Sequence, residues 1–314
     1  MNAKVLTAAT VAALSCFVST VWAERPSEDA TCEFPGGAYY KSNNTMYLES
    51  INDENARVEI SNVTINCVKE NASGDFNLVV ERSTKLSANS TIVLPMNYTP
   101  KSSCVELYEP NQFSTDEDGN WGVTAKNAKG QGDINKPMLM ITHTDREECQ
   151  DIKEIEFKAN NLAVTGQADI SVWLYNNKTQ NCDWIFQGTY NFVRWDKDHA
   201  DLGVVYGYAA KDKGKVTAGH FTKVGAGAYI PPMRAYLKYI GKTPLAKSIE
   251  SIVELPETID VILVEEEGTT RMARWNMATG EIVKVNGWYD LKGRKLNRKP
   301  QNKGMFIGNT KVQK

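Results

Sequence analysis

The chain has 314 residues, with 36 Lys or Arg and 38 Asp or Glu, so its formal net charge is −2. This near balance excludes the strong positive field typical of nucleic-acid binders, so we expect no nucleic-acid partner. The length fits about two folding units, although one large β domain can also reach this size.

Residues 1–23 have the pattern of a secretory signal peptide. A single lysine precedes an apolar run from Val5 to Val18, and the small residue Ala23 stands directly before Glu24. We predict cleavage between Ala23 and Glu24. The apolar run is too short for a stable membrane anchor, so we expect an exported mature chain without a transmembrane segment. A lipoprotein site at Cys16 is the less favoured alternative, because apolar residues continue beyond it.

The six cysteines include Cys16 in the predicted leader, which leaves five in the mature chain. In an exported protein these are disulfide candidates, and their odd number allows at most two intrachain bridges. We favour Cys32–Cys67 and Cys149–Cys182, with Cys104 free and buried in a strand. The spacing contains no C-x-x-C pair of the kind that binds metal.

Short runs with alternating apolar and polar residues, or with continuous β-branched character, recur along the chain and predict strands. These runs are Arg57–Asn66, Phe76–Glu81, Thr91–Leu94, Cys104–Glu109, Met138–Thr142, Ala168–Tyr175, Trp184–Val193, Gly203–Ala210, Met233–Ile240, Ile259–Glu265 and Arg271–Asn276. The helical signal is confined to one short segment, 245–253, which ends before Pro256. The pattern predicts an all-β fold, most simply an antiparallel β-sandwich of immunoglobulin-like or jelly-roll-like type.

The predicted organisation has four parts after the leader. An N-terminal β segment covers 24–74, and the β-sandwich body covers 75–242. A short helix or linker and a β-hairpin follow at 243–284. The last part, 285–314, is a short β tail rich in lysine and arginine.

Candidate catalytic chemistry is sparse. His143, His199 and His220 are scattered without a partner at ligand spacing, and we expect polar surface residues there. Zinc-protease, nucleophile-elbow and phosphate-loop motifs are absent from the sequence. We therefore assign no catalytic residue, no metal site and no cofactor, and the ligand-binding residues stay unknown. A carboxylate pair for glycoside hydrolysis is defined by separation in space, so an exported hydrolase remains an alternative.

Aromatic side chains are the other candidate for function. Exposed rings can stack on sugars, whereas buried rings fill a β core or form cross-strand pairs. We expect most to be core or cross-strand residues, as in W-L-Y (Trp173, Tyr175) and in Y-N-F-V-R-W (Tyr190, Phe192, Trp195). A carbohydrate-binding platform is the alternative.

An ordered series of segments carries a family resemblance. The segments are S-T-I-V-L-P (90–95), I-F-Q-G-T-Y (185–190), V-Y-G-Y-A-A (205–210), F-T-K-V-G-A-G-A-Y-I-P-P-M-R-A-Y-L (221–237), L-P-E-T-I-D-V-I-L-V (255–264) and W-Y-D-L-K-G-R-K-L-N (288–297). The series resembles the β-rich surface modules of secreted proteins from the Bacteroidota and Fibrobacterota. The resemblance covers roughly residues 75–314 and implies no catalytic residues.

The end of the chain resembles a type IX secretion-like sorting tail. The matching residues are Trp288, Tyr289, Asp290, Leu291, Gly293, Arg294 and Lys295. The resemblance implies Sec export followed by passage through the outer membrane, with the secretion machinery as a partner. The match is shorter than a usual sorting domain, so it implies secretion more directly than anchoring.

Together these features predict an exported, non-catalytic protein, secreted or held on the outer cell surface. Its expected role is structural, adhesive or interactive, with polysaccharide or cell-surface proteins as candidate partners. The alternatives are a carbohydrate-binding surface protein and an exported hydrolase with an unrecognised carboxylate site.

Overall fold

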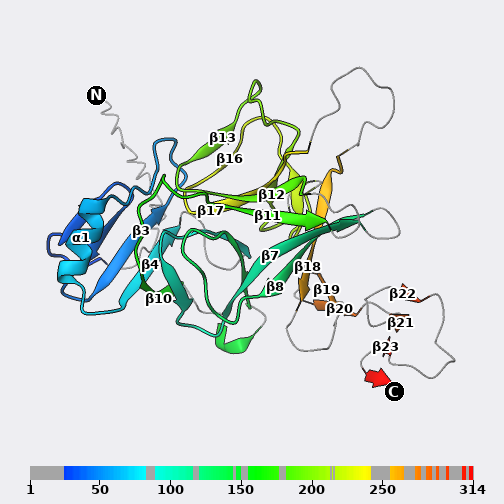
Figure 1. Cartoon of the computed structure of the whole chain (residues 1–314), viewed down its shortest axis with the longest axis horizontal. Helices are drawn as coiled ribbons and strands as arrows, with labels where there is room; N and C mark the ends of the chain where they lie inside the picture. The colour runs from blue at the N-terminus through cyan, green and yellow to red at the C-terminus, as the bar shows by residue number, and fades with distance from the viewer. Residues whose placement is uncertain are drawn as a thin grey trace, which may run out of the picture.

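The computed structural model describes residues 25–82, 89–115, 120–143, 146–149, 155–176, 182–212, 214, 216–241 and 255–264, together with short strands further along the chain (Figure 1). Strand makes up 48% of the structure, so the predicted all-β class is confirmed. The predicted leader, its cleavage site at Ala23 and Glu24, and the predicted helix at 245–253 lie outside the described residues. Within the described part, no helix has the length and apolar character needed to cross a bilayer.

The N-terminal part of the chain forms a six-stranded sheet. Its order is β1 (Cys32–Phe34), β2 (Gly37–Tyr40), β3 (Thr45–Ser50), β4 (Phe76–Arg82), β10 (Glu156–Asn160) and β6 (Asn97–Pro100). Strands β3 and β4 are parallel, and the helix α1 (Asn62–Asn71) lies in the connection between them. A parallel pair needs such a crossover, because a tight turn cannot reverse the chain twice.

The larger sheet closes into an eight-stranded barrel. In order around the barrel, its strands are β11 (Ser171–Asn176), β12 (Trp184–Thr189), β17 (Arg234–Tyr239), β14 (Val205–Tyr208), β15 (Phe221–Lys223), β18 (Thr258–Val264), β8 (Trp121–Asn127) and β7 (Val105–Thr115). The parallel pairing of β11 with β7 closes the ring, and β18 with β8 is also parallel. Closure leaves these strands without an open sheet edge.

The long strand β7 explains how this sheet both closes and branches. Its first residues pair with β9 (Met138–Thr142), which in turn pairs with β5 (Ser90–Ile92). After an irregularity between Pro110 and Gln112, the later part of β7 pairs with β11 instead. A β-bulge bends and twists a strand, which lets its two halves serve different neighbours. The arrangement therefore differs from the predicted antiparallel sandwich: a closed barrel with two parallel pairs adjoins an open sheet.

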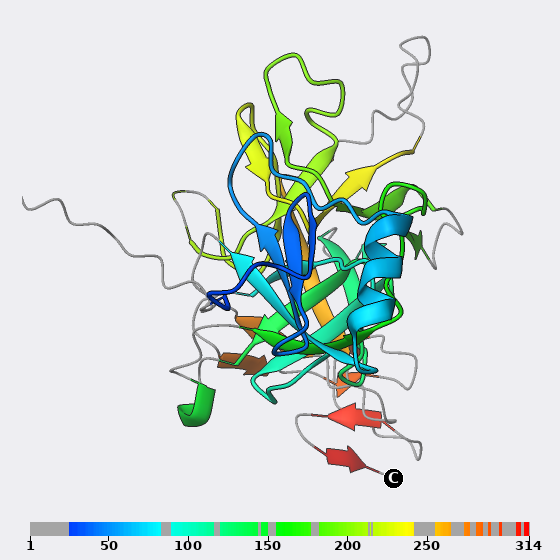
Figure 2. The same cartoon turned by 90° about the vertical axis from the view of Figure 1, so that its left-hand side faces the viewer.

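The strand predicted at Arg57–Asn66 is wrong. Arg57 forms only an isolated bridge with Asn191, and Val58 and Ile60 are buried outside any strand. Ser61 caps α1 and accepts a hydrogen bond from the Thr64 backbone. The Thr64 hydroxyl in turn accepts a hydrogen bond from the Ser61 backbone, which completes a capping box. The helix then buries one side, including Ile65, and lies along the N-terminal sheet (Figure 2).

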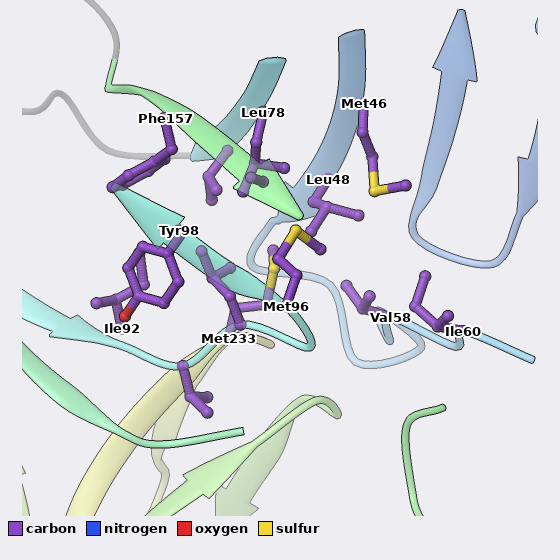
Figure 3. Close-up of a cluster of buried hydrophobic side chains, with 14 of the residues drawn as sticks. Met46, Leu48, Val58, Ile60, Leu78, Ile92, Met96, Tyr98, Phe157 and Met233 are labelled. Atoms are coloured by element: carbon purple, nitrogen blue, oxygen red, sulfur yellow. The ribbon is translucent and has the colours of Figure 1, made fainter. Parts of the chain in front are cut away.

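Two hydrophobic cores support the described body. One lies between α1, the six-stranded sheet and the segment around β5. Figure 3 shows the part of this core around Leu48, Met96 and Met233. The other fills the barrel, where Trp184 stacks on Phe113 with ring centroids 4.6 Å apart. Offset and edge-on aromatic pairs of this kind add about 0.5–1.5 kcal/mol beyond their buried area. The barrel interior is therefore a packed aromatic core.

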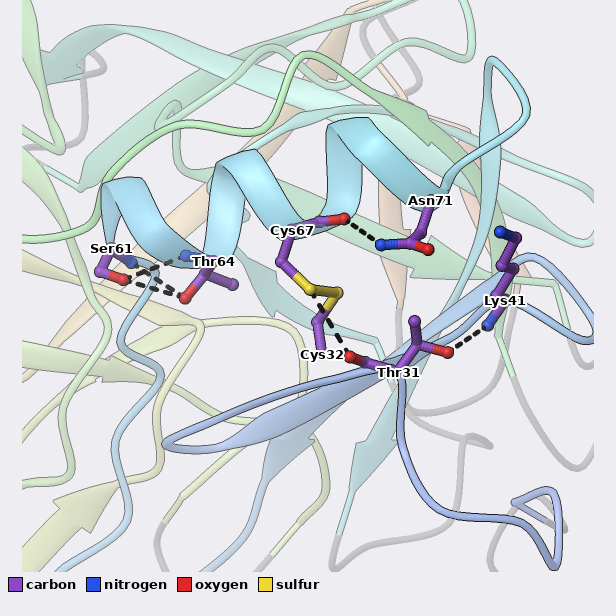
Figure 4. The surroundings of a disulfide bond; sticks show 7 residues. All are labelled: Thr31, Cys32, Lys41, Ser61, Thr64, Cys67 and Asn71. Atoms are coloured by element: carbon purple, nitrogen blue, oxygen red, sulfur yellow. Dashed lines mark hydrogen bonds between the residues drawn. A yellow bond between two sulfur atoms is a disulfide. The ribbon is translucent and has the colours of Figure 1, made fainter.

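Two disulfides connect neighbouring elements. Cys32–Cys67, the first pairing favoured from the sequence, ties β1 to α1 (Figure 4). The second bridge joins Cys104 to Cys149 in the short 3-10 helix η1 (Glu147–Cys149), and Cys182 is free and exposed. The predicted Cys149–Cys182 bridge and free Cys104 are therefore wrong. Pairing of β7 with β9 brings Cys104 beside the turn that carries Cys149.

Shorter strands complete the described chain. They are β13 (Val193–Trp195) with β16 (Ala228–Ile230), β19 (Ala273–Asn276) with β20 (Glu281–Lys284), and a four-stranded sheet of β22 (Lys295–Leu296), β21 (Trp288–Tyr289), β23 (Phe306–Gly308) and β24 (Lys311–Gln313). The hairpin of β19 and β20 falls within 243–284, where a hairpin was predicted. The predicted tail residues Asp290, Leu291, Gly293 and Arg294 lie outside the described residues.

Candidate functional site

Two aromatic side chains stand on the outer face of the barrel. Trp173 is 56% exposed and Tyr175 is 40% exposed, whereas Leu174 between them is fully buried. Alternate residues of a strand point to opposite faces, so the two rings share the outer side of β11. We call this pair the aromatic strip. Tyr190 and Trp195 are buried, as expected of core residues, whereas Trp173 and Tyr175 are exposed and lie opposite Ile185 and Gln112 on neighbouring strands.

The pairing register of the neighbouring strands places one apolar and two polar residues beside the aromatic strip. Ile185 of β12 lies opposite Trp173, and Lys238 of β17 lies opposite Ile185. Gln112 of β7 lies opposite Tyr175. Residues that face each other across neighbouring strands share a sheet face. The two rings of the strip therefore lie beside one apolar side chain and two hydrogen-bonding side chains.

A polar pocket of about 560 Å³ lies at the edge of the N-terminal sheet, beside β6 and β10. Its lining includes Asp75, Asn97, Thr99, Lys101, Gln131, Asp133, Lys158 and Asn160. Asp75 accepts a hydrogen bond from Asn160 at 3.1 Å, and Asn97 accepts one from the Ile134 backbone at 2.9 Å. The pocket brings two carboxylates, Asp75 and Asp133, to one surface. Sequence spacing could not reveal this pair, because its members lie on separate segments.

The Tyr98 ring packs closely against Gly132 next to this pocket. A Cβ atom at position 132 would lie 2.0 Å from the tyrosine ring, so only glycine fits there. Backbone hydrogen bonds join the two residues in both directions, at 2.8 and 2.9 Å. This contact fixes the loop that carries Gln131 and Asp133 against β6.

A second cluster of ionisable groups surrounds Glu106 on β7. One carboxylate oxygen lies 3.0 Å from Nε2 of His143 and 3.4 Å from Arg146, and the other accepts a hydrogen bond from Tyr108 at 2.8 Å. The neighbouring His143 and the Tyr108 hydrogen bond outweigh burial and lower the pKa of Glu106 to about 2. His143 itself is buried, so its predicted surface position is wrong. The cluster adjoins the Cys104–Cys149 bridge and holds a charged carboxylate at the beginning of β7.

The other two histidines serve separate local contacts. Nδ1 of His199 accepts a hydrogen bond from the Asp201 backbone at 3.1 Å. Nε2 of His220 lies 3.2 Å from Asp260, and this contact raises the pKa of His220. Among the described residues, no three His, Cys, Asp or Glu side chains gather in a group that could hold a metal ion.

Comparison with protein-family models, with curated proteins and with solved structures found no match to this chain. The aromatic strip is the surface whose composition points most directly to a class of ligand.

Proposed function

We propose that this chain is an exported, non-catalytic binding protein that holds polysaccharide on the outer face of the barrel. The observation that carries the proposal is the exposure of Trp173 and Tyr175 on one side of β11. This is the carbohydrate-binding alternative within the broader prediction of an adhesion or interaction protein.

The flat faces of Trp173 and Tyr175 suit the binding of sugar rings. A sugar ring has one face made of C–H groups, and the electron-rich face of an aromatic ring attracts these groups while shielding them from water. Residues two apart on a strand are separated by about 6.6 Å, so the two rings can contact neighbouring sugars of one chain. Gln112 lies beside the strip and offers hydrogen-bonding groups to sugar hydroxyls, whereas Nζ of Lys238 donates to Asp201 at 2.8 Å.

Several features support export. Disulfides persist mainly in oxidising compartments, and two bridges staple the described body. The leader-like residues 1–23 and the tail that resembles a sorting signal point to the same destination. A protein that binds polysaccharide outside the cell must first be exported, and the leader and the sorting-like tail would together direct that export.

A binding assay with matched variants tests the proposal. Purified protein is mixed with insoluble cellulose, xylan, chitin and mannan, and the bound fraction is measured against protein concentration. Replacing Trp173 or Tyr175 with alanine should weaken binding to the retained glycan at least tenfold, which corresponds to about 1.4 kcal/mol. Tyr229→Ala is the control, because Tyr229 is 49% exposed on β16, outside the strip. Retention of no glycan, or equal losses in all three variants, would contradict a carbohydrate role for the strip.

The same incubations address the hydrolase alternative. Asp75 and Asp133 line one pocket, so a glycosidase would use this pair. Release of reducing ends that disappears in Asp75→Asn and Asp133→Asn would assign catalysis to the pocket. Binding without release would favour the non-catalytic proposal.

A further inference from the structure

The floor of the polar pocket beside β6 and β10 is the outer face of these two strands. Lys158 of β10 lies directly opposite Thr99 of β6, and Asn160 lies opposite Asn97. On each strand, the residue between these two is buried in the core. Residues that alternate along a strand point to opposite faces, and paired residues share a face. Four hydrogen-bonding side chains therefore stand side by side on the pocket floor, and all four line the pocket.

Hydrogen bonds within the protein hold the walls of this pocket in place. On one side, the loop at 131–133 is fixed by the paired backbones of Gly132 and Tyr98. On the other side, the Asn160 amide donates to the Asp75 carboxylate at 3.1 Å. A site whose walls are fixed before a ligand arrives loses little conformational freedom when the ligand binds. The pocket is therefore preorganised for a small molecule.

The charges of the pocket lining cancel. The lining holds two carboxylates and two lysines, Asp75, Asp133, Lys101 and Lys158. Some of this charge is also paired within the protein, since Nζ of Lys101 lies 2.8 Å from Glu156 and Asp133 lies 3.5 Å from Lys136. A ligand with one strong charge would meet a side chain of its own sign as well as one of the opposite sign. The lining therefore favours a ligand without net charge.

Hydrogen-bond donors and acceptors are mixed in the same lining. Lysines donate, carboxylates accept, and amide and hydroxyl side chains do both. The amides and the hydroxyl here belong to Asn97, Gln131, Asn160 and Thr99. A hydroxyl group on a ligand also donates and accepts, so neighbouring hydroxyls of one molecule can satisfy side chains of either kind. The volume of about 560 Å³ lies within the range of about 300–1,000 Å³ of small-molecule sites.

We propose that the polar pocket binds a single neutral sugar unit. The side chains of the floor and walls hold the sugar through its hydroxyl groups, with Lys158 donating and Asp75 accepting. The described lining residues belong to the segments at 75, 97–101, 131–133 and 158–160, whereas the aromatic strip stands on β11. The pocket is thus a second site, and its argument is independent of polysaccharide binding on the barrel.

Titrations with soluble monosaccharides test the pocket. The purified protein is titrated with glucose, galactose, mannose, xylose and N-acetylglucosamine up to tens of millimolar, and binding is measured by ligand-observed NMR and isothermal titration calorimetry. Glucuronate, glucosamine and glycine supply an anion, a cation and a zwitterion for comparison. At least one neutral sugar should bind saturably, and more tightly than all three charged compounds. Binding of a charged compound alone, or of no compound in the series, would overturn the proposal.

Variants assign the binding to the pocket. Lys158→Met removes an exposed donor from the floor and should weaken sugar binding at least tenfold, the loss expected for a hydrogen bond to a charged group. Gln131→Ala on the wall should weaken it about threefold to tenfold, as for a neutral hydrogen bond. Lys69→Met is the matched control, because Lys69 is an exposed lysine on α1, outside the pocket lining.

The aromatic strip provides the opposing outcome. Loss of monosaccharide binding in Trp173→Ala, without a loss in Lys158→Met, would assign the sugar to the strip. That result would overturn the pocket while leaving the polysaccharide proposal intact. Loss in Lys158→Met and Gln131→Ala, with wild-type binding in Lys69→Met, would support the pocket even if the protein retained no insoluble glycan.

Discussion

Ionisable side chains inside this protein differ in whether an oppositely charged group lies beside them. Glu106 is surrounded by His143, Tyr108 and Arg146, so its carboxylate stays ionised inside the fold. Arg82 enters a comparable environment without an acidic partner in the described chain. Removing one partner of a buried charge pair leaves an uncompensated charge and destabilises the fold.

The Glu106 cluster predicts a specific pH dependence. The pKa of Glu106 falls from 4.5 to about 2 on folding, so the ionised group stabilises the fold above pH 4.5. This contribution, at most about 3 kcal/mol, is lost as the pH falls from 4.5 towards 2. Glu106→Gln should therefore be less stable than wild type at pH 6, and the gap should narrow towards pH 2. Urea unfolding at several pH values measures the gap, and a constant difference would contradict the assignment.

Individual elements take their positions from distant contacts. Strand β7 pairs with β8, β9 and β11, so one strand connects the barrel to its branch. The Cys104–Cys149 bridge fixes the beginning of this strand to η1. This disulfide restricts the conformations of the unfolded chain near the beginning of β7, the strand that the barrel shares with its branch.

Removing that bridge should lower stability substantially. The two cysteines are 45 residues apart, and closing a loop of this size stabilises a protein by about 4 kcal/mol in the chain-entropy account. The double variant Cys104→Ala/Cys149→Ala should lose about this much free energy of unfolding, measured with urea. Cys182→Ser is the matched control, because this exposed thiol forms no bridge. A comparable loss in Cys182→Ser would show that a different cysteine pairing forms.

At the scale of the whole molecule, the described body and the tail strands form separate sheets. The tail strands β21, β22, β23 and β24 pair with one another. A self-paired terminal sheet is compatible with a detachable signal that another protein reads. The sorting role itself remains a proposal drawn from the resemblance of residues 288–297.

Deleting residues 288–314 tests that role. In a bacterium with a type IX-like route, the full chain should reach the medium or the cell surface, while the truncated chain should stay in the periplasm. Cell fractions probed by immunoblot give the distribution. A chain with the same tail residues in scrambled order controls for length and charge. Unchanged secretion of the truncated chain would contradict the sorting hypothesis.

Local sequence determined the β class of this protein and many of its strand positions. A continuous apolar run identified the strand Met138–Thr142, and the run Ala168–Tyr175 predicted the strand that carries Trp173 and Tyr175. The Ser61 cap lay within a run that alternated like a strand, so local pattern alone misassigned the start of α1. Strand class and strand position depend on neighbours within a few residues, which a sequence displays directly, whereas the choice of a helix at Ser61 did not follow from that pattern.

Tertiary structure decided the closure of the barrel, the partner of Cys149 and the outward direction of the aromatic strip. Closure depends on the pairing of β7 with β11, whose paired residues are more than 60 positions apart. Alternation shows which side chains share a face, but it does not show which face the rest of the chain covers. That choice depends on the sum of long-range packing, and it turned Leu174 inward and left Trp173 exposed to solvent.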